Sequence, residues 1–133
     1  MKVLALDYGT KRTGLALGDT EAGLAFPRGV ISGLGDQELI NRLIDIIKRE
    51  GVEQVVVGEP TGLSGQDSSQ TLSSRTFSDK LGQTLSVPVV LYDERLTSRQ
   101  ADLAQNQGSR YERDELAALF LLQSYLDSYQ IKK

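Results

Sequence analysis

Short apolar runs alternate with turn-forming residues through the first quarter of the chain. Residues 2–7 form one run that ends at a carboxylate, and 14–18 and 24–31 form two more, each after a polar turn. Closely spaced runs of this kind predict three strands connected as hairpins. Pro27 lies inside the third run. Because proline cannot donate a hydrogen bond to a neighbouring strand, we expect this strand at a sheet edge or at a bulge.

Helical spacing replaces this pattern after residue 35. Apolar residues recur three or four positions apart from Asp36 up to Gly51, which predicts a helix that ends at the glycine. These apolar residues are Leu39, Ile40, Leu43, Ile44 and Ile47. Phe77, Leu81 and Leu85 lie four residues apart and predict a second, more polar helix.

Two continuous apolar runs, 55–57 and 88–92, predict buried strands of the kind that crossover helices connect in parallel. A loop rich in Gly, Ser and Thr, 61–67, follows the first run. The second run ends in acidic residues. Together with the three hairpin strands, these runs predict a sheet of five strands.

The last segment, 112–129, is apolar on nearly all sides, which predicts a buried helix. Thr97 is placed to cap a short helix over 98–105, and 108–111 is expected to form a loop. Hairpin strands followed by alternating helices and strands are typical of an α/β fold. We therefore expect a single domain over 1–133, with a mixed five-stranded sheet and helices on both faces.

The amino-acid composition limits which kinds of catalytic or metal-binding site the chain can form. The 133 residues include neither cysteine nor histidine, which excludes disulfides, thiol nucleophiles, Cys/His zinc sites and imidazole bases. There are 15 Lys and Arg against 18 Asp and Glu, a net charge of −3. This balance argues against a strong non-specific nucleic-acid binder, but not against a metal-dependent one, because bound cations offset clustered carboxylates.

No membrane or export segment is expected. No run reaches the ~18 apolar residues of a membrane span, and the opening run is too short for the core of a signal peptide. We therefore expect a cytoplasmic protein with no membrane partner.

Acidic residues lie where predicted elements begin or end. Asp7 ends the first strand, Asp93 and Glu94 follow the last, and Asp114 opens the final helix. Ligands gather beyond the carboxyl ends of strands in open sheets, so these acids are expected to converge. Converging carboxylates repel one another unless a cation lies between them, and hard oxygen ligands favour Mg²⁺ or Mn²⁺. Singly, each acid also suits an ordinary turn or a first helical turn.

A basic turn follows Asp7, with Lys11 and Arg12 between Gly9 and Gly14. Backbone amides and two cations in such a turn can meet a phosphate. The same residues also suit a solvated hairpin tip whose glycines serve turn geometry. From spacing alone, both interpretations stay open.

Four motifs together resemble the YqgF family. These bacterial proteins have a ribonuclease H-like fold, are related to Holliday junction resolvases, and are regarded as nucleases for the small-subunit ribosomal RNA precursor. The motifs follow the family's order along almost the whole chain. They are LDYGTKRTGLA (6–16), VVVGEP (55–60), DERLT (93–97) and RDELAA (113–118), which continues into LQSYL (122–126).

The resemblance implies a metal-dependent nuclease that hydrolyses phosphodiester bonds. Asp7, Glu94 and Asp114 match the family's acidic positions and are implied as the catalytic residues and as ligands of Mg²⁺ or Mn²⁺. Glu59 departs from the pattern, because an apolar residue is expected between the glycine and the proline. It stays open whether Glu59 joins the metal site or Glu94 serves another purpose.

The resemblance also implies a nucleic-acid partner, either an RNA precursor or a branched DNA such as a Holliday junction. Lys11, Arg12 and Arg95 are expected to bind substrate phosphates without reading sequence. Symmetric cleavage of a four-way junction requires two sites and therefore a homodimer, whereas trimming an RNA end does not.

Two other functional classes are compatible with these residues. Sugar kinases and actin-like ATPases share the fold family and open with an acid and a glycine-rich phosphate hairpin. They bind nucleotide between two such domains, however, and this chain has no second copy of the hairpin motif. A non-catalytic module that binds nucleic acid, the ribosome or the transcription machinery would suit the acidic net charge.

Overall fold

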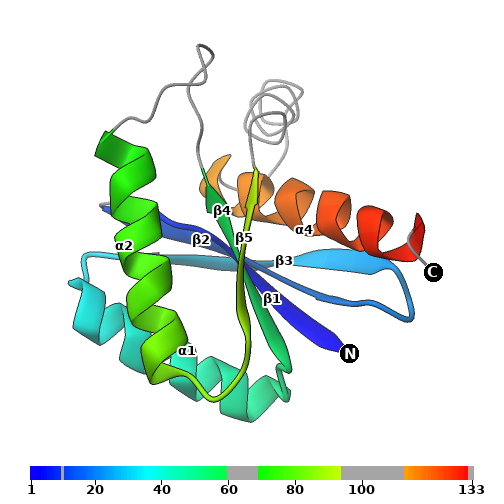
Figure 1. Cartoon of the computed structure of the whole chain (residues 1–133), viewed down its shortest axis with the longest axis horizontal. Helices are drawn as coiled ribbons and strands as arrows, with labels where there is room; N and C mark the ends of the chain where they lie inside the picture. Colours follow the sequence, from blue (N-terminus) through cyan, green and yellow to red (C-terminus); the bar gives the residue numbers. More distant parts are fainter. Residues whose placement is uncertain (10, 60–68, 94–112, 132–133) are drawn as a thin grey trace.

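The computed structural model describes residues 1–9, 11–59, 69–93 and 113–131, and its centre is a mixed five-stranded sheet (Figure 1). The strands lie in the order β3-β2-β1-β4-β5. β2 is antiparallel to β1 and β3, and β4 is parallel to β1 and β5. The strands are β1 (Lys2–Asp7), β2 (Arg12–Asp19), β3 (Leu24–Ser32), β4 (Gln54–Glu59) and β5 (Val89–Asp93). The helices are α1 (Asp36–Glu50), α2 (Ser69–Thr84) and α4 (Arg113–Ile131).

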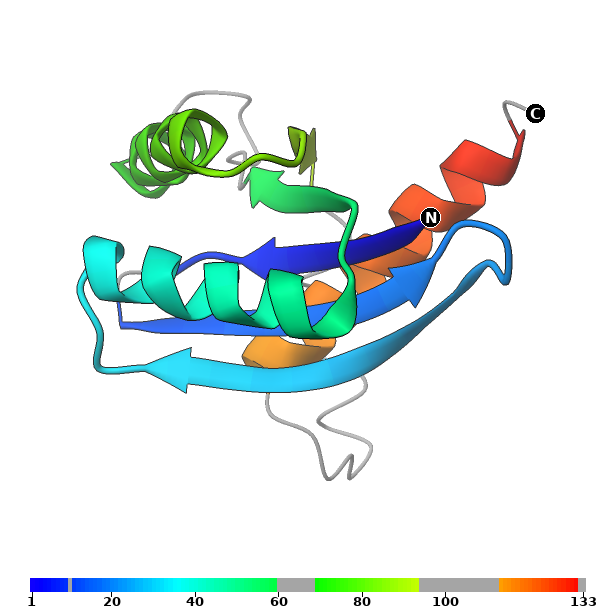
Figure 2. The ribbon, with the colours of Figure 1, turned by 90° about the horizontal axis from the view of Figure 1, so that it is seen from below.

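The side chains of β1 point alternately into two separate hydrophobic cores. Leu4 and Leu6 pack in one core with α1 and α2, whereas Val3 and Ala5 pack in the other with α4. Successive side chains of a strand point to opposite faces, so this one buried strand anchors helices on both sides. Figure 2 shows α1 and α4 on opposite sides of the β1–β3 part of the sheet.

Helix α1 has the charge distribution that a helix dipole favours. Asp36 and Glu38 lie in its first turn, and Lys48 and Arg49 lie in its last. Gly51 follows with a left-handed backbone, φ 70°, which glycine adopts without strain. The predicted helix and its glycine end are thus confirmed. The buried residues of α1 are Leu39, Ile40, Leu43, Ile46 and Ile47.

Strand β3 forms one edge of the sheet. Pro27 pairs with Ala16, and Gly29 pairs with the preceding Leu15, so β3 carries one extra residue at this point. A bulge beside a proline discourages a further strand from pairing with the edge. The expected edge position and bulge are both observed.

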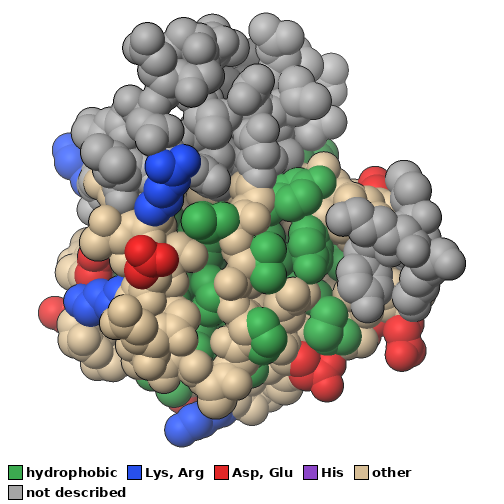
Figure 3. Space-filling model, viewed as in Figure 1, with side chains coloured by type: hydrophobic (Ala, Val, Ile, Leu, Met, Phe, Trp, Pro, Cys, Tyr) green, Lys and Arg blue, Asp and Glu red, His purple; other side chains and the backbone are tan. Residues whose placement is uncertain are grey.

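Strand β5 forms the other edge and contacts both α2 and α4. Its residues from Val89 to Tyr92 are half-buried. In the view of Figure 3, hydrophobic side chains cluster between α2 and α4, and charged side chains lie at the margins of this cluster. The sheet edge is therefore flanked by both helical layers.

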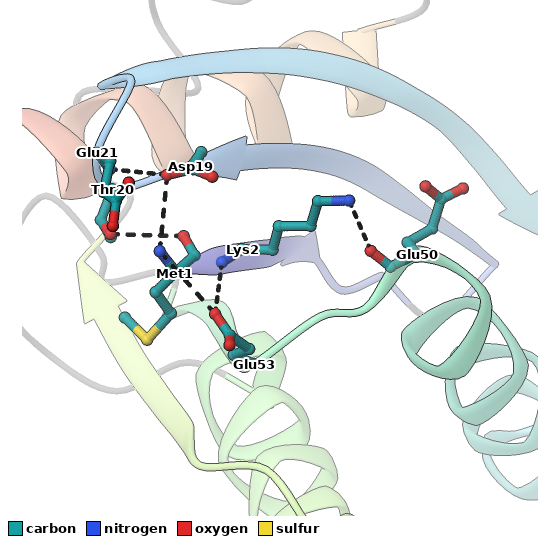
Figure 4. A network of polar contacts seen from close by, with 7 residues as sticks. All are labelled: Met1, Lys2, Asp19, Thr20, Glu21, Glu50 and Glu53. Atoms are coloured by element: carbon teal, nitrogen blue, oxygen red, sulfur yellow. Dashed lines mark hydrogen bonds and ion pairs between the residues drawn. The ribbon is translucent and has the colours of Figure 1, made fainter.

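Polar contacts hold the amino end of β1 (Figure 4). The amino group of Met1 lies 3.6 Å from Asp19 Oδ1 and 3.9 Å from Glu53 Oε2. The backbone N–H of Lys2 donates to the same Glu53 oxygen at 3.0 Å. These contacts fix β1 at the end opposite Asp7, so they position the strand without occupying its carboxyl end.

The predicted fold class is confirmed, as are the five strands and the helices that the structure describes. Helix α4 is buried on most sides, although Leu119 and Phe120 are only partly buried. The predicted loops 61–67 and 108–111 and the predicted helix 98–105 lie outside the described residues. None of the helices within the described ranges is both long and apolar enough to cross a membrane.

Candidate metal and nucleic-acid site

The carboxyl end of β1 meets the first turn of α4. Asp7 is the last residue of β1 and pairs with Gly14 in β2. Asp7 follows Val3 and Ala5 at intervals of two, so its side chain lies on the face that α4 covers. Asp114 is the second residue of α4.

Gly14 brings the two acids together. A Cβ atom on Gly14 would overlap the backbone carbonyl of Asp114, so the first turn of α4 lies directly against β2 at this point. Paired residues of antiparallel strands share a face. Asp7 therefore lies beside the place where the α4 backbone reaches the sheet, and Asp7 and Asp114 occupy neighbouring positions. Gly14 serves this close approach inside β2, rather than the geometry of the turn.

Asp114 forms an ion pair with Arg12. Arg12 Nε lies 3.2 Å from Asp114 Oδ2, and the carboxylate side chain is 18% exposed whereas the arginine side chain is 57% exposed. The first turn of α4 also carries Glu115, and the positive end of the helix dipole favours acids there. A shielded carboxylate thus faces an arginine that remains largely in solvent.

On the other face of the sheet, Tyr8 anchors the same turn. The Tyr8 hydroxyl donates to Asp36 Oδ1 at 2.7 Å, and its ring stacks on Phe77 of α2 with centroids 4.1 Å apart and planes 2° from parallel. Burial, together with the hydrogen bond to the Asp36 carboxylate, raises the pKa of Tyr8 to about 12. The residue after Asp7 is thereby tied to the first turn of α1 and to α2.

A further contact fixes the basic turn. The N–H of Gly33 donates to the carbonyl of Lys11 at 3.3 Å, while the Lys11 side chain is exposed. Tyr8, Lys11 and Asp36 also line a small hollow on the α1 face. The turn is therefore held by its backbone and by Tyr8, which leaves the cationic side chains of Lys11 and Arg12 accessible to solvent.

The other residues considered for the site are Glu94, Arg95 and Glu59. Glu94 and Arg95 lie outside the described residues. Glu59 ends β4 and pairs with Asp93 in the register of β4 and β5. Among the residues that the structure describes, no three acidic side chains are grouped closely enough to hold a metal ion.

The donor set fits a hard divalent cation. Asp7 and Asp114 supply carboxylate oxygens, the ligands that Mg²⁺ prefers, and Mg²⁺ usually binds through one or two carboxylates and keeps several waters. Two neighbouring carboxylates from the described part of the chain are therefore a sufficient start for such a site. The ligand role of these acids stays a prediction.

Sequence reasoning missed the cluster of Tyr8, Asp36 and Phe77. Helical spacing assigned Phe77 to a buried face, and Asp36 to a helix start, but nothing in either pattern connects them with Tyr8. The available signal was the position of Tyr8, which alternation along the first strand places on the face opposite Asp7.

Comparison with known protein families shows which family this chain belongs to. A family model described as "RuvX: Holliday junction resolvase" matches residues 1–128. The chain belongs to the RuvX family. This finding confirms the resemblance that the four motifs carry, because RuvX and YqgF denote the same family.

Curated relatives of this RuvX-family chain match it over nearly its full length. One from Desulforudis audaxviator is 38% identical over 134 residues, covering 96% of this chain and 95% of the relative. One from Caldanaerobacter subterraneus is 39% identical over 135 residues, covering 96% and 97%. Both carry the name "Putative pre-16S rRNA nuclease".

Solved structures show the same fold. RuvC of Thermus thermophilus, in complex with a Holliday junction substrate, matches with a TM-score of 0.68 at 15% identity, over 98% of this chain and 96% of that chain. Fowlpox virus resolvase, in complex with Holliday junction DNA, matches with a TM-score of 0.62 at 14% identity, over 97% and 99%. The RuvX-family chain therefore has a RuvC-like, ribonuclease H-like fold.

Replacing Gly14 by alanine is expected to destabilise the protein by about 2 kcal/mol, because the new Cβ forces the α4 backbone away from β2. Thermal unfolding should show a melting temperature lower by about 8 °C. Gly82→Ala is the matched control, since a Cβ on Gly82 of α2 would have no neighbouring atom within 4 Å, and the change should be tolerated or add stability. Equal melting temperatures for Gly14→Ala and wild type would contradict the close approach.

Tyr8→Phe keeps the ring stack but removes the hydrogen bond to a charged acceptor, which is expected to cost about 1.5 kcal/mol. The pKa of Tyr8 is raised in the folded state, so this stabilisation is complete below pH 10 and is lost as the pH rises toward 12. Urea unfolding at pH 8, 10 and 11 measures it. Tyr125→Phe, which removes a 3.1 Å hydrogen bond to the neutral Gln54, is the control and should cost less. A gap between wild type and Tyr8→Phe that widened with pH would contradict this assignment.

Proposed function

We propose that this RuvX-family protein is a divalent-metal-dependent nuclease that hydrolyses phosphodiester bonds. The observation that carries the proposal is the packing of α4 on Gly14, which brings Asp7 and Asp114 to neighbouring positions at the carboxyl edge of the sheet. A cation shared by the two acids would relieve the repulsion between them, and the chain has no histidine or cysteine that could serve as a ligand instead.

In this proposal Asp7 and Asp114 hold Mg²⁺ or Mn²⁺, and Glu94 completes the ligand set. Glu94 is included on sequence grounds: it belongs to the DERLT motif and follows Tyr92, whose ring packs toward α4, by two positions. The bound metal would activate water and stabilise the leaving oxygen of the phosphodiester. Glu59, at the end of the neighbouring β4, is the alternative third acid.

The cations beside these acids are proposed to hold the substrate. Lys11 and Arg12 are exposed on the turn that follows Asp7, and Arg95 is adjacent to Glu94 in the sequence. Such contacts bind phosphates without reading bases, and affinity from a few of them falls as salt rises. Because the net charge is −3, we expect the protein to bind nucleic acid weakly and mainly through these cations.

We propose that the substrate is the end of the small-subunit ribosomal RNA precursor. We propose that the protein acts in the cytoplasm. Relatives that match nearly the whole chain carry the name "Putative pre-16S rRNA nuclease". The solved neighbours bound to Holliday junctions share the fold at low identity, so branched DNA is the second substrate to test. Cleavage of a junction at two symmetric points would also require the protein to be a homodimer.

Asp7→Asn is expected to lower the rate of cleavage at least about 10³-fold, because losing the metal removes several kcal/mol of transition-state stabilisation. The assay uses labelled ribosomal RNA precursor, single-stranded RNA and a four-way DNA junction in Mg²⁺ or Mn²⁺. Excess EDTA should abolish cleavage by wild type, and added Mg²⁺ should restore it.

Asp45→Asn is the matched control. Asp45 is an exposed aspartate of α1 that pairs with Arg49 at 3.1 Å, and its replacement should leave the rate unchanged. Cleavage by Asp7→Asn at the wild-type rate would contradict the nuclease site. If wild type cleaves none of the substrates with either metal, the chain is instead a binding module. A rise in melting temperature with nucleotide, without cleavage, would favour the phosphotransferase class.

A further inference from the structure

The ion pair of Arg12 and Asp114 differs from the other arginine pairs in the described part of the chain. Arg28 pairs with Glu50 at 3.3 Å and Arg49 with Asp45 at 3.1 Å, and their carboxylate side chains are 35% and 62% exposed. Asp114 is 18% exposed and lies beside a second acid, Asp7. It is thus the most shielded carboxylate among these pairs.

A shielded carboxylate next to another acid requires a nearby positive charge. Arg12 supplies positive charge here, because its Nε lies 3.2 Å from Asp114 Oδ2, and its own side chain is 57% exposed. An ion pair whose arginine is more than half exposed is worth little in water, so its carboxylate is readily exchanged for another anion. Arg12 therefore supplies positive charge that a bound metal ion would supply in its place.

We propose that Arg12 exchanges Asp114 for a substrate phosphate, so that divalent metal and nucleic acid bind to this chain cooperatively. The inference rests on the proposed function. When Asp114 binds a cation, its negative charge is neutralised and the guanidinium of Arg12 is released toward solvent. A phosphate of the nucleic-acid backbone then takes the place of Asp114 beside Arg12.

The exchange predicts that metal and nucleic acid each strengthen the binding of the other. In the absence of nucleic acid, Arg12 competes with the metal for Asp114. In its presence, Arg12 pairs with phosphate and no longer competes. Because coupling between two ligands acts equally in both directions, a metal that strengthens RNA binding must itself be bound more tightly in the presence of RNA.

The test measures Mn²⁺ affinity by electron paramagnetic resonance for wild type, Arg12→Ala and Arg28→Ala. Without RNA, Arg12→Ala is expected to bind Mn²⁺ about threefold to tenfold more tightly than wild type, because the competing ion pair is gone. With saturating single-stranded RNA, shown on a gel to be intact after the measurement, this difference should disappear. Arg28→Ala removes a comparable ion pair on β3 and should match wild type in both conditions.

Equal or weaker Mn²⁺ binding by Arg12→Ala in the absence of RNA would overturn the exchange, as would a gain of the same size in Arg28→Ala. Circular dichroism checks that each variant is folded, and Arg12→Gln replaces Arg12→Ala if the alanine variant is not. Failure of the proposed function would give a different result. Either wild type would bind no Mn²⁺, or Asp7→Asn would bind Mn²⁺ as tightly as wild type does.

Discussion

The contact between the backbone of α4 and Gly14 of β2 determines where the two acids of the candidate site meet. Without a side chain at Gly14, the first turn of α4 lies against the sheet at the point where Asp7 ends β1. The acids come from opposite ends of the sequence, and only this packing makes them neighbours. The apolar length of α4, which fills the core on that face, holds the turn in place.

Asp7 at the end of β1 and Tyr8 in the turn after it lie on opposite faces of the sheet. Asp7 faces α4 and the candidate metal site, whereas Tyr8 faces α1 and α2, where it stacks on Phe77 and donates to Asp36. The strand end is therefore fixed from behind by buried contacts. For the proposed role of Asp7 as a metal ligand, such support would matter, because small displacements of catalytic groups are costly.

Local patterns in the sequence were sufficient to predict the strands and helices that the structure describes and their order, because strand alternation, helical spacing and the glycine after α1 are local signals. The rule that ligands gather at the carboxyl ends of strands also predicted that Asp7 and Asp114 converge. The role of Gly14, the cluster around Tyr8 and the pairing of Arg12 with Asp114 were not predictable. Each depends on how a helix docks on the sheet, and no periodicity in the chain records that distance.

Asp7 and Asp114 are proposed to share one divalent cation. Anomalous diffraction from crystals grown with Mn²⁺ tests it most directly, because the metal is located without reference to activity. A shared Mn²⁺ should give a peak within about 2.5 Å of a carboxylate oxygen of each residue. Crystals with saturating Mn²⁺ but no peak between these carboxylates, or with the metal bound elsewhere, would contradict it.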